Sequence, residues 1–196
     1  MKFLEKCVLM AGDNNKGKRQ AVFFDRDGVI NFRIYKHYIS DFKEFGFLED
    51  FLDLFNYLKD KNYMLIIVTN QQGVGKGIMT ETQLAEVHRK MQSELEKRFG
   101  RRFDDILFCP DISHSGSTRR KPEPGMLLEA AEKWNLDLKS SWMIGDRKSD
   151  AKAGKRAGCQ TIIVGNGDGE PIPEADHYFL DLYKVIEFFE RYLLKL

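Results

Sequence analysis

The sequence predicts an α/β fold in which a parallel sheet carries helices on both faces. Short runs of consecutive apolar residues, such as residues 21–24, recur along the chain and alternate with longer amphipathic segments. A strand that is apolar at every position is buried on both faces, which is typical of parallel sheets. The regular alternation of such strands with helical segments indicates a Rossmann-like sheet covered on both sides.

Six strands are expected, each from an apolar run that ends near polar residues or glycine. Residues 29–46, after the first run, mix aromatic and polar side chains without a clear period and are interpreted as a loop. The strands are expected at residues 21–24, 63–68, 106–108, 142–145, 161–164 and 177–180.

Helices are expected where apolar residues recur with helical spacing. Thr80 and Gln83 form a capping box that starts the longest helix, and Gly100 ends it. Pro124 suits the first turn of a later helix, and Gly158 closes the helix that follows. The helices are expected at residues 47–61, 80–99, 124–134, 147–157 and 182–195.

A chain of 196 residues is long enough for one domain with a sizeable core. We expect this domain at residues 19–196, preceded by an N-terminal extension at residues 1–18. The formal net charge is +1, so the chain lacks the excess of positive charge that is typical of nucleic-acid-binding proteins. No apolar run approaches the length needed to span a bilayer. Neither nucleic acid nor a membrane is therefore expected as a partner, and a monomer is favoured.

The cysteines and the N-terminus favour a cytoplasmic location. Cys7, Cys109 and Cys159 are widely spaced and odd in number, so reduced thiols are the simplest interpretation. The first six residues carry mixed charges, unlike a signal peptide.

Residues 12–18 nearly form a phosphate-binding loop of the pattern Gly-x-x-x-x-Gly-Lys. Arg19 stands where that motif needs Ser or Thr for magnesium, and a strand follows where a helix should begin. A nucleotide site is therefore not expected here.

Polar side chains follow the ends of several expected strands. Because the carboxyl ends of parallel strands meet at one edge of a sheet, we expect these side chains to converge on a binding site. They are Asp25 and Asp27 after the first strand, Thr69 and Asn70 after the second, Lys121 in the loop after the third, and Asp146 after the fourth.

The chemistry of this set points to phosphoryl transfer. The carboxylates of Asp25, Asp27 and Asp146 need a neutralising cation if they lie together, and a few hard oxygen ligands suit Mg²⁺. Lys121 and Thr69 offer a positive charge and a hydroxyl to a phosphoryl group. One carboxylate can attack phosphorus and form an aspartyl-phosphate. A second carboxylate, crowded by the first, can have a raised pKa and act as acid and then as base.

Four ordered motifs carry these residues: Asp-Arg-Asp-Gly-Val-Ile-Asn at 25–31, Val-Thr-Asn-Gln-Gln-Gly at 68–73, Arg-Lys-Pro-x-Pro-Gly-Met at 120–126 and Gly-Asp-x-x-x-Asp at 145–150. They resemble the motifs of the haloacid dehalogenase superfamily of phosphatases. The resemblance is greatest to the branch that contains histidinol-phosphate phosphatase and D-glycero-D-manno-heptose 1,7-bisphosphate 7-phosphatase. It spans most of the chain and implies a haloacid dehalogenase-like fold.

The resemblance implies a role for each carboxylate. Asp25 would be the nucleophile and a magnesium ligand. Asp27 would protonate the leaving group and then activate water, with its main-chain carbonyl on the metal. Asp146 would be the third protein ligand of magnesium. Asp150 would lie next to these ligands without binding the metal itself.

The resemblance also implies the groups that bind the substrate. Thr69 and Lys121 would hold the phosphoryl group, Asn70 would help to fix the substrate, and Arg120 would contact it beyond its phosphate. The substrate would be a small phosphate ester, most simply a phosphorylated sugar such as the heptose bisphosphate.

Two departures from the family pattern bear on this expectation. Many members carry a zinc loop, Cys-x-His followed by Cys-x-Cys, just before Arg-Lys-Pro. Residues 109–119 keep only Cys109 and His114, with a different spacing, and two ligands do not close a tetrahedral site, so no zinc is expected. The segments after the first and third strands are too short for a separate cap domain. An open site is therefore expected, with a rim that includes Tyr35, Lys36, His37, Tyr38 and Lys76.

Several alternative functions remain compatible with the motifs. Histidinol phosphate is the second candidate substrate. A polynucleotide 3′-phosphatase shares the Thr-Asn-Gln-x-Gly and Arg-Lys-Pro patterns, although the near-neutral charge disfavours it. A receiver-like phospho-acceptor domain would place its Asp after the third strand, where this chain has Cys109. A binding protein that has lost activity is at odds with the intact Asp25, Asp27, Lys121 and Asp146.

Overall fold

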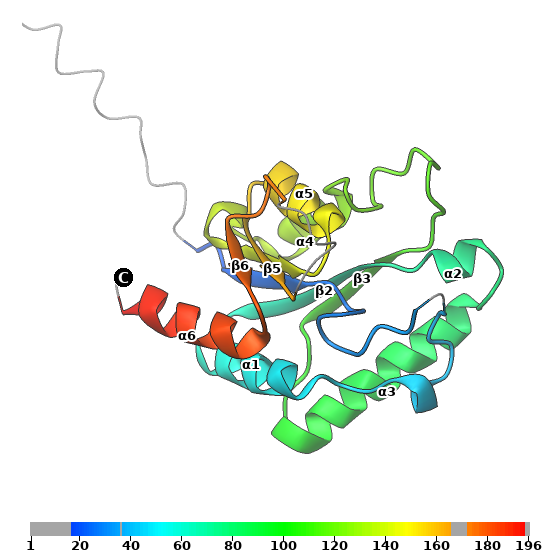
Figure 1. Cartoon of the computed structure of the whole chain (residues 1–196), viewed down its shortest axis with the longest axis horizontal. Helices are drawn as coiled ribbons and strands as arrows, with labels where there is room; N and C mark the ends of the chain where they lie inside the picture. The colour runs from blue at the N-terminus through cyan, green and yellow to red at the C-terminus, as the bar shows by residue number, and fades with distance from the viewer. Residues whose placement is uncertain (1–16, 36, 166–171, 195–196) are drawn as a thin grey trace, which may run out of the picture.

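The computed structural model describes residues 17–35, 37–165 and 172–194, and these form a six-stranded parallel sheet with helices on both faces (Figure 1). The strands lie in the order β3-β2-β1-β4-β5-β6. Phe24 of β1 aligns with Ile67 of β2 on one side and with Ile144 of β4 on the other. The expected fold class is confirmed, and the carboxyl ends of β1, β2 and β4 lie next to one another.

The strands are β1 (Ala21–Phe24), β2 (Met64–Asn70), β3 (Asp105–Cys109), β4 (Trp142–Gly145), β5 (Gln160–Val164) and β6 (His177–Phe179). The α-helices are α1 (Glu49–Asp60), α2 (Gln72–Gly75), α3 (Glu81–Phe99), α4 (Gly125–Trp134), α5 (Lys148–Ala157) and α6 (Leu182–Leu193). Short 3₁₀ helices lie at Phe42–Glu44 and Leu138–Ser140.

Two apolar clusters hold the helices against the sheet. Val22 and Phe24 of β1 pack into a cluster with side chains of α1, α3 and α6. Ala21 and Phe23 point the other way and pack with side chains of α4 and α5. The apolar positions at every residue of β1 therefore serve two layers of helices, as a doubly covered strand requires.

Two differences from the expected elements lie beside the sheet edge that carries the polar side chains. β2 continues through Thr69 and Asn70, because these residues still pair with Phe108 and Cys109 of β3. The single turn of α2 was not expected, since the glycines within it are poor helix formers. Its N–H at Gly75 donates to the Pro110 carbonyl at 3.2 Å, so the loop after β3 supports the turn.

Three further expectations concern the N-terminal extension, a separate cap domain and membrane-spanning helices. Only residues 17 and 18 of the expected N-terminal extension are described, so Cys7 and most of residues 12–18 lie outside the structure. In the described ranges, the loops after β1 and β3 hold no inserted domain. No helix among the described residues is long and apolar enough to span a bilayer.

Candidate active site

The candidate site begins where β1 ends. All four β1 residues are buried, and Asp25 follows them with 7% of its surface exposed. The N–H of Asp25 donates to the Ile144 carbonyl of β4 at 3.0 Å, which fixes the residue at the edge of the sheet. The chain then turns sharply, and the N–H groups of Ile30 and Asn31 both donate to the Arg26 carbonyl. The carboxylate of Asp25 is thus held by the regular end of a central strand.

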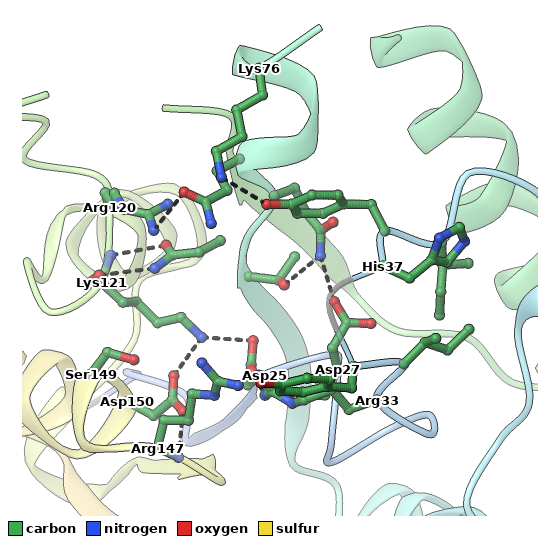
Figure 2. Close-up of a pocket in the computed structure, with 18 residues that line it drawn as sticks. Asp25, Asp27, Arg33, His37, Lys76, Arg120, Lys121, Arg147, Ser149 and Asp150 are labelled. Carbon is green, nitrogen blue, oxygen red and sulfur yellow. Dashed lines mark hydrogen bonds and ion pairs between the residues drawn. The ribbon is translucent and has the colours of Figure 1, made fainter. Parts of the chain in front are cut away.

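Lys121 lies between two carboxylates from different elements (Figure 2). Its Nζ is 2.8 Å from Oδ1 of Asp25 and 2.7 Å from Oδ1 of Asp150, and only 3% of Lys121 is exposed. Burial by itself lowers the pKa of the Lys121 ammonium, but the carboxylates of Asp150 and Asp25 outweigh it, and the net shift is upward. The ammonium therefore stays charged beside the Asp25 carboxylate.

Arg33 lies on the other side of Asp25. Its Nη2 is 2.8 and 2.7 Å from the two carboxylate oxygens of Asp146 and 3.7 Å from Oδ2 of Asp25. The same nitrogen donates to the main-chain carbonyl of Asp27. One guanidinium nitrogen thus lies among the oxygens of the three residues that the sequence analysis named as magnesium ligands.

Asp146 carries a raised pKa. Burial is the largest cause, the nearby carboxylates of Asp25 and Asp150 add to it, and Arg33 and Arg147 oppose it. Together these effects raise the pKa of Asp146 to about 7. A further cation beside this carboxylate would favour its ionised form.

The Asp27 carboxylate has its own set of partners. Arg26 forms an ion pair with it at 2.9 Å, Asn31 donates to it at 3.0 Å, and Nε2 of Gln71 donates to it at 3.0 Å. Burial raises the pKa of Asp27, but the Arg26 charge and these hydrogen bonds outweigh it, and the net shift is downward. The expectation that crowding by Asp25 raises this pKa is therefore wrong for this arrangement, because Arg26 supplies the nearest charge.

The side chains from β2 act partly through their neighbours. Oδ1 of Asn70 accepts the N–H of Lys121 at 3.0 Å, and its Nδ2 donates to the Lys121 carbonyl at 2.9 Å. Asn70 therefore positions the backbone of Lys121, a role that the sequence analysis did not assign to it. Thr69 is 1% exposed, and its hydroxyl accepts a hydrogen bond from Gln71 at 3.0 Å.

Asp25, Asp27, Thr69, Asn70 and Lys121 line one cleft of about 540 Å³ (Figure 2). Arg120 lies on its wall, where Nη1 donates to the Asp111 carbonyl at 2.8 Å. Lys76, which directly follows α2, lies on the same side, and its Nζ is 3.2 Å from the Tyr38 hydroxyl. The expected rim residues Tyr35, His37, Tyr38 and Lys76 all line the cleft, and Lys36 lies outside the described residues. The cationic side chains around the cleft are Arg33, Lys76, Arg120, Lys121 and Arg147.

The carboxylates fit a divalent cation. Asp25, Asp146 and Asp150 each offer an oxygen within 4.8 Å of the others. Both oxygens of Asp150 are engaged, one by Lys121 and the other by the N–H of Arg147 at 3.0 Å. The oxygens that remain are those around Nη2 of Arg33, where a positive charge already lies. Hard oxygen donors of this kind are the ligands that Mg²⁺ prefers.

In the loop after β3, the described contacts of the Cys109 thiol are with an aspartate and a serine, not with a second cysteine or a histidine. Sγ of Cys109 lies 3.4 Å from Oδ2 of Asp111 and 3.7 Å from Oγ of Ser117. His114 adopts a positive φ of 66°. The absence of zinc from this protein stays a prediction.

The contacts of Arg26, Arg33 and Gln71 in the site were not predicted from the sequence. Gln71 joins Thr69 to Asp27, and Arg26 is 1% exposed beneath the site. Arg26 and Gln71 lie inside the motifs at 25–31 and 68–73, and their place in these motifs is the only sequence signal for them. Arg33 lies in a loop without periodicity, and nothing in its sequence context indicated its contacts.

The fold and this set of side chains define a haloacid dehalogenase (HAD)-like hydrolase, and the HAD-hydrolase-like family profile matches residues 118–182. The chain is 37% identical to D-glycero-alpha-D-manno-heptose-1,7-bisphosphate 7-phosphatase of Campylobacter jejuni, over 88% of this chain and 97% of that protein. It is 35% identical to D-glycero-beta-D-manno-heptose-1,7-bisphosphate 7-phosphatase of Pasteurella multocida, over 80% of this chain and 86% of that protein. The chain belongs to this family of heptose bisphosphate phosphatases within the HAD-like hydrolases.

A solved structure supports the same relationship. The crystal structure of D,D-heptose 1,7-bisphosphate phosphatase from B. bronchiseptica, complexed with magnesium and phosphate, matches this chain with a TM-score of 0.80. The two chains are 29% identical, and the match covers 88% of this chain and 98% of that one.

Proposed function

We propose that this protein is a magnesium-dependent phosphatase that removes the 7-phosphate of D-glycero-D-manno-heptose 1,7-bisphosphate through an aspartyl-phosphate on Asp25. The observation that carries the proposal is the position of Asp25 between two cationic side chains, with the buried Lys121 on Oδ1 and Arg33 near Oδ2. A carboxylate so placed at the floor of a cationic cleft is oriented for attack on a phosphoryl group.

The chain's own groups divide the reaction between them. An Asp25 oxygen forms the new bond to phosphorus as the sugar oxygen leaves with a proton from Asp27. Water then attacks phosphorus, Asp27 takes its proton, and phosphate and free Asp25 result. Lys121 and Thr69 hold the phosphoryl oxygens throughout.

The lowered pKa of Asp27 suits the second of these steps directly, because an ionised carboxylate is needed to accept a proton from water. For the first step, a phosphate dianion close to Asp27 would raise the pKa of its carboxyl again.

The residues that would hold the metal are Asp25, Asp146 and the main-chain carbonyl of Asp27. Bound there, Mg²⁺ would neutralise the carboxylates and the phosphoryl oxygens. Asp150 would stand behind this set, since its oxygens hold Lys121 and the N–H of Arg147.

The preference for a bisphosphate rests on the cations beyond Lys121. Arg120 and Lys76 line the cleft wall away from Asp25 (Figure 2) and would suit a second phosphate at the far end of a sugar. The relatives include proteins named for the α anomer and others named for the β anomer of the heptose. Both anomers are therefore candidate substrates.

A substrate panel tests the proposal. The purified protein would be assayed for phosphate release, with and without Mg²⁺, on both heptose bisphosphate anomers, histidinol phosphate, sugar monophosphates and a 3′-phosphorylated oligonucleotide. We expect the highest kcat/KM for one heptose bisphosphate anomer and no turnover in EDTA. A tenfold preference for histidinol phosphate or the oligonucleotide would identify that compound as the substrate in place of the heptose bisphosphate. The proposed phosphatase mechanism would be unaffected.

A further inference from the structure

We propose that Arg33 is a built-in counter-ion that competes with Mg²⁺ for the same oxygens, so that the guanidinium must move aside before the metal binds. The inference rests on the magnesium site of the proposed function. It concerns metal binding alone and needs no substrate.

The geometry places Arg33 where the metal would be. Nη2 contacts both carboxylate oxygens of Asp146, the main-chain carbonyl of Asp27 and, at 3.7 Å, Oδ2 of Asp25. Magnesium binds oxygen ligands at about 2.0–2.1 Å, so an ion held by these oxygens would overlap with the nitrogen. Two positive centres cannot share this space, and Arg33 and Mg²⁺ therefore exclude one another.

Arg33 is also placed so that it can leave. It belongs to the loop that connects β1 to α1, and its side chain is 29% exposed at the cleft. Its Nε is buried without a hydrogen-bond partner among the described residues, so the guanidinium is imperfectly satisfied in this position. A swing toward the cleft would release this nitrogen to water, and the contacts of Nη2 would pass to the metal.

The consequence for affinity is a simple population argument. If Arg33 occupies the site for most of the time, the apparent dissociation constant of Mg²⁺ is the intrinsic value divided by the small fraction of molecules in which Arg33 is away. A variant that lacks the guanidinium should therefore bind the metal more tightly.

Isothermal titration of metal-free protein with Mg²⁺ alone tests this consequence in Arg33→Gln. We expect the dissociation constant to fall about tenfold, which corresponds to about 1.4 kcal/mol. Arg147→Gln is the matched control, because Arg147 also acts electrostatically on Asp146, while its N–H contacts Asp150 rather than the oxygens around Arg33. It reports the effect of removing one positive charge from the site without removing an occupant. An equal change in both variants, or no tightening in Arg33→Gln, would overturn the inference.

A second measurement uses the unmodified protein and so does not depend on how the variants fold. Phenylglyoxal modifies accessible arginines, and peptide mass spectrometry gives its rate at Arg33. We expect Mg²⁺ to increase the rate at Arg33 several-fold and to leave the rate at Arg119, an exposed arginine paired with Glu129, unchanged. An Arg33 rate that is insensitive to Mg²⁺ would contradict the inference.

The two proposals fail in different ways. Magnesium binding that is unaffected by Arg33→Gln would remove only the role of Arg33. Binding of Mg²⁺ with no turnover of any phosphate ester would remove only the proposed function. Absence of Mg²⁺ binding in every form of the protein would overturn both.

Discussion

Gly28 and Asp146 approach so closely that a side chain at residue 28 has no room. A Cβ atom built on Gly28 would lie 2.3 Å from Oδ2 of Asp146. Gly28 also has a φ of +96°, which L side chains rarely adopt. The turn after β1 thus brings the backbone directly against the carboxylate that follows β4. This contact explains why the Asp-x-Asp motif ends in glycine.

Gly28→Ala should therefore damage the metal site more than the fold. The positive φ costs about 1–2 kcal/mol for any L residue, and the methyl group must also displace Asp146. We expect weaker Mg²⁺ binding and lower turnover, measured by titration and phosphate release. Gly158→Ala is the control, because Gly158 has a φ of +90° but nothing within 4 Å of its added Cβ. If both variants lose the same stability and neither loses metal affinity, the contact with Asp146 is unimportant.

The end of β1 was predictable because two different signals agree there. A run of apolar residues indicates a doubly buried strand, and the rule for ligand sites in parallel sheets turns Asp25 into a site residue. Lys121 was found in the same way, from the loop that follows a strand. Its partner Asp150 could be assigned only through the family resemblance, since a carboxylate in a helix is normally a solvated charge.

The position of Arg33 could not be predicted, because its contacts depend on the path of an aperiodic loop. The lowered pKa of Asp27 could not be predicted for a related reason. The sequence places Arg26 next to Asp27, but it does not show that the Arg26 guanidinium folds back onto the Asp27 carboxylate, as it does in the structure. The local sequence therefore predicts where the strands end, but it does not predict the directions in which the side chains point.

Asp25→Asn should abolish turnover while the protein still folds. The amide keeps the shape of the side chain but is a very poor nucleophile, so we expect kcat to fall about a thousandfold or more. Phosphate release and circular dichroism would be measured together, with the surface variant Asp60→Asn as control, since Asp60 pairs only with Arg101 in the described contacts. Turnover close to that of the unmodified protein would show that Asp25 is not the nucleophile.

Lys121→Met should destabilise the protein as well as inactivate it. Removing the ammonium leaves Asp25 and Asp150 as buried carboxylates, and breaking a buried ion pair in this way typically costs about 3–5 kcal/mol. The double variant Lys121→Met with Asp150→Asn should recover part of this free energy of unfolding but no activity. Denaturant unfolding of these two variants and of Asp150→Asn alone gives the coupling energy, and strictly additive effects would mean that Lys121 and Asp150 act independently.

The loop at residues 109–119 should hold no zinc. Cys109 is buried and contacts Asp111 and Ser117, and neither contact supplies a further thiolate or imidazole. Elemental analysis of protein purified without chelators should give zinc well below one ion per chain, and Cys109→Ser should keep the same metal content. A stoichiometric amount of zinc that disappears in Cys109→Ser would refute this expectation.

His88 should make the protein less stable in mild acid. It is 7% exposed, and its Nε2 lies 3.2 Å from Nη1 of Arg26. Burial and the Arg26 charge lower the pKa of His88 to about 3, although the Asp27 carboxylate opposes them. Because Arg26 can only donate, Nε2 must accept, and the folded protein therefore requires the neutral imidazole.

The sign of the pH effect follows from this difference between the folded and unfolded states. Unfolded His88 takes up a proton below its ordinary pKa of about 6.5, whereas folded His88 does not until about pH 3. Between these values the unfolded chain binds more protons, so stability falls as the pH falls. The free energy of unfolding should drop by about 2 kcal/mol from pH 7 to pH 5 through this group alone. His88→Gln keeps an acceptor for Arg26 but cannot titrate, so the difference between its pH profile and that of the unmodified protein isolates the effect. Two parallel profiles would mean that His88 titrates alike in the folded and the unfolded protein.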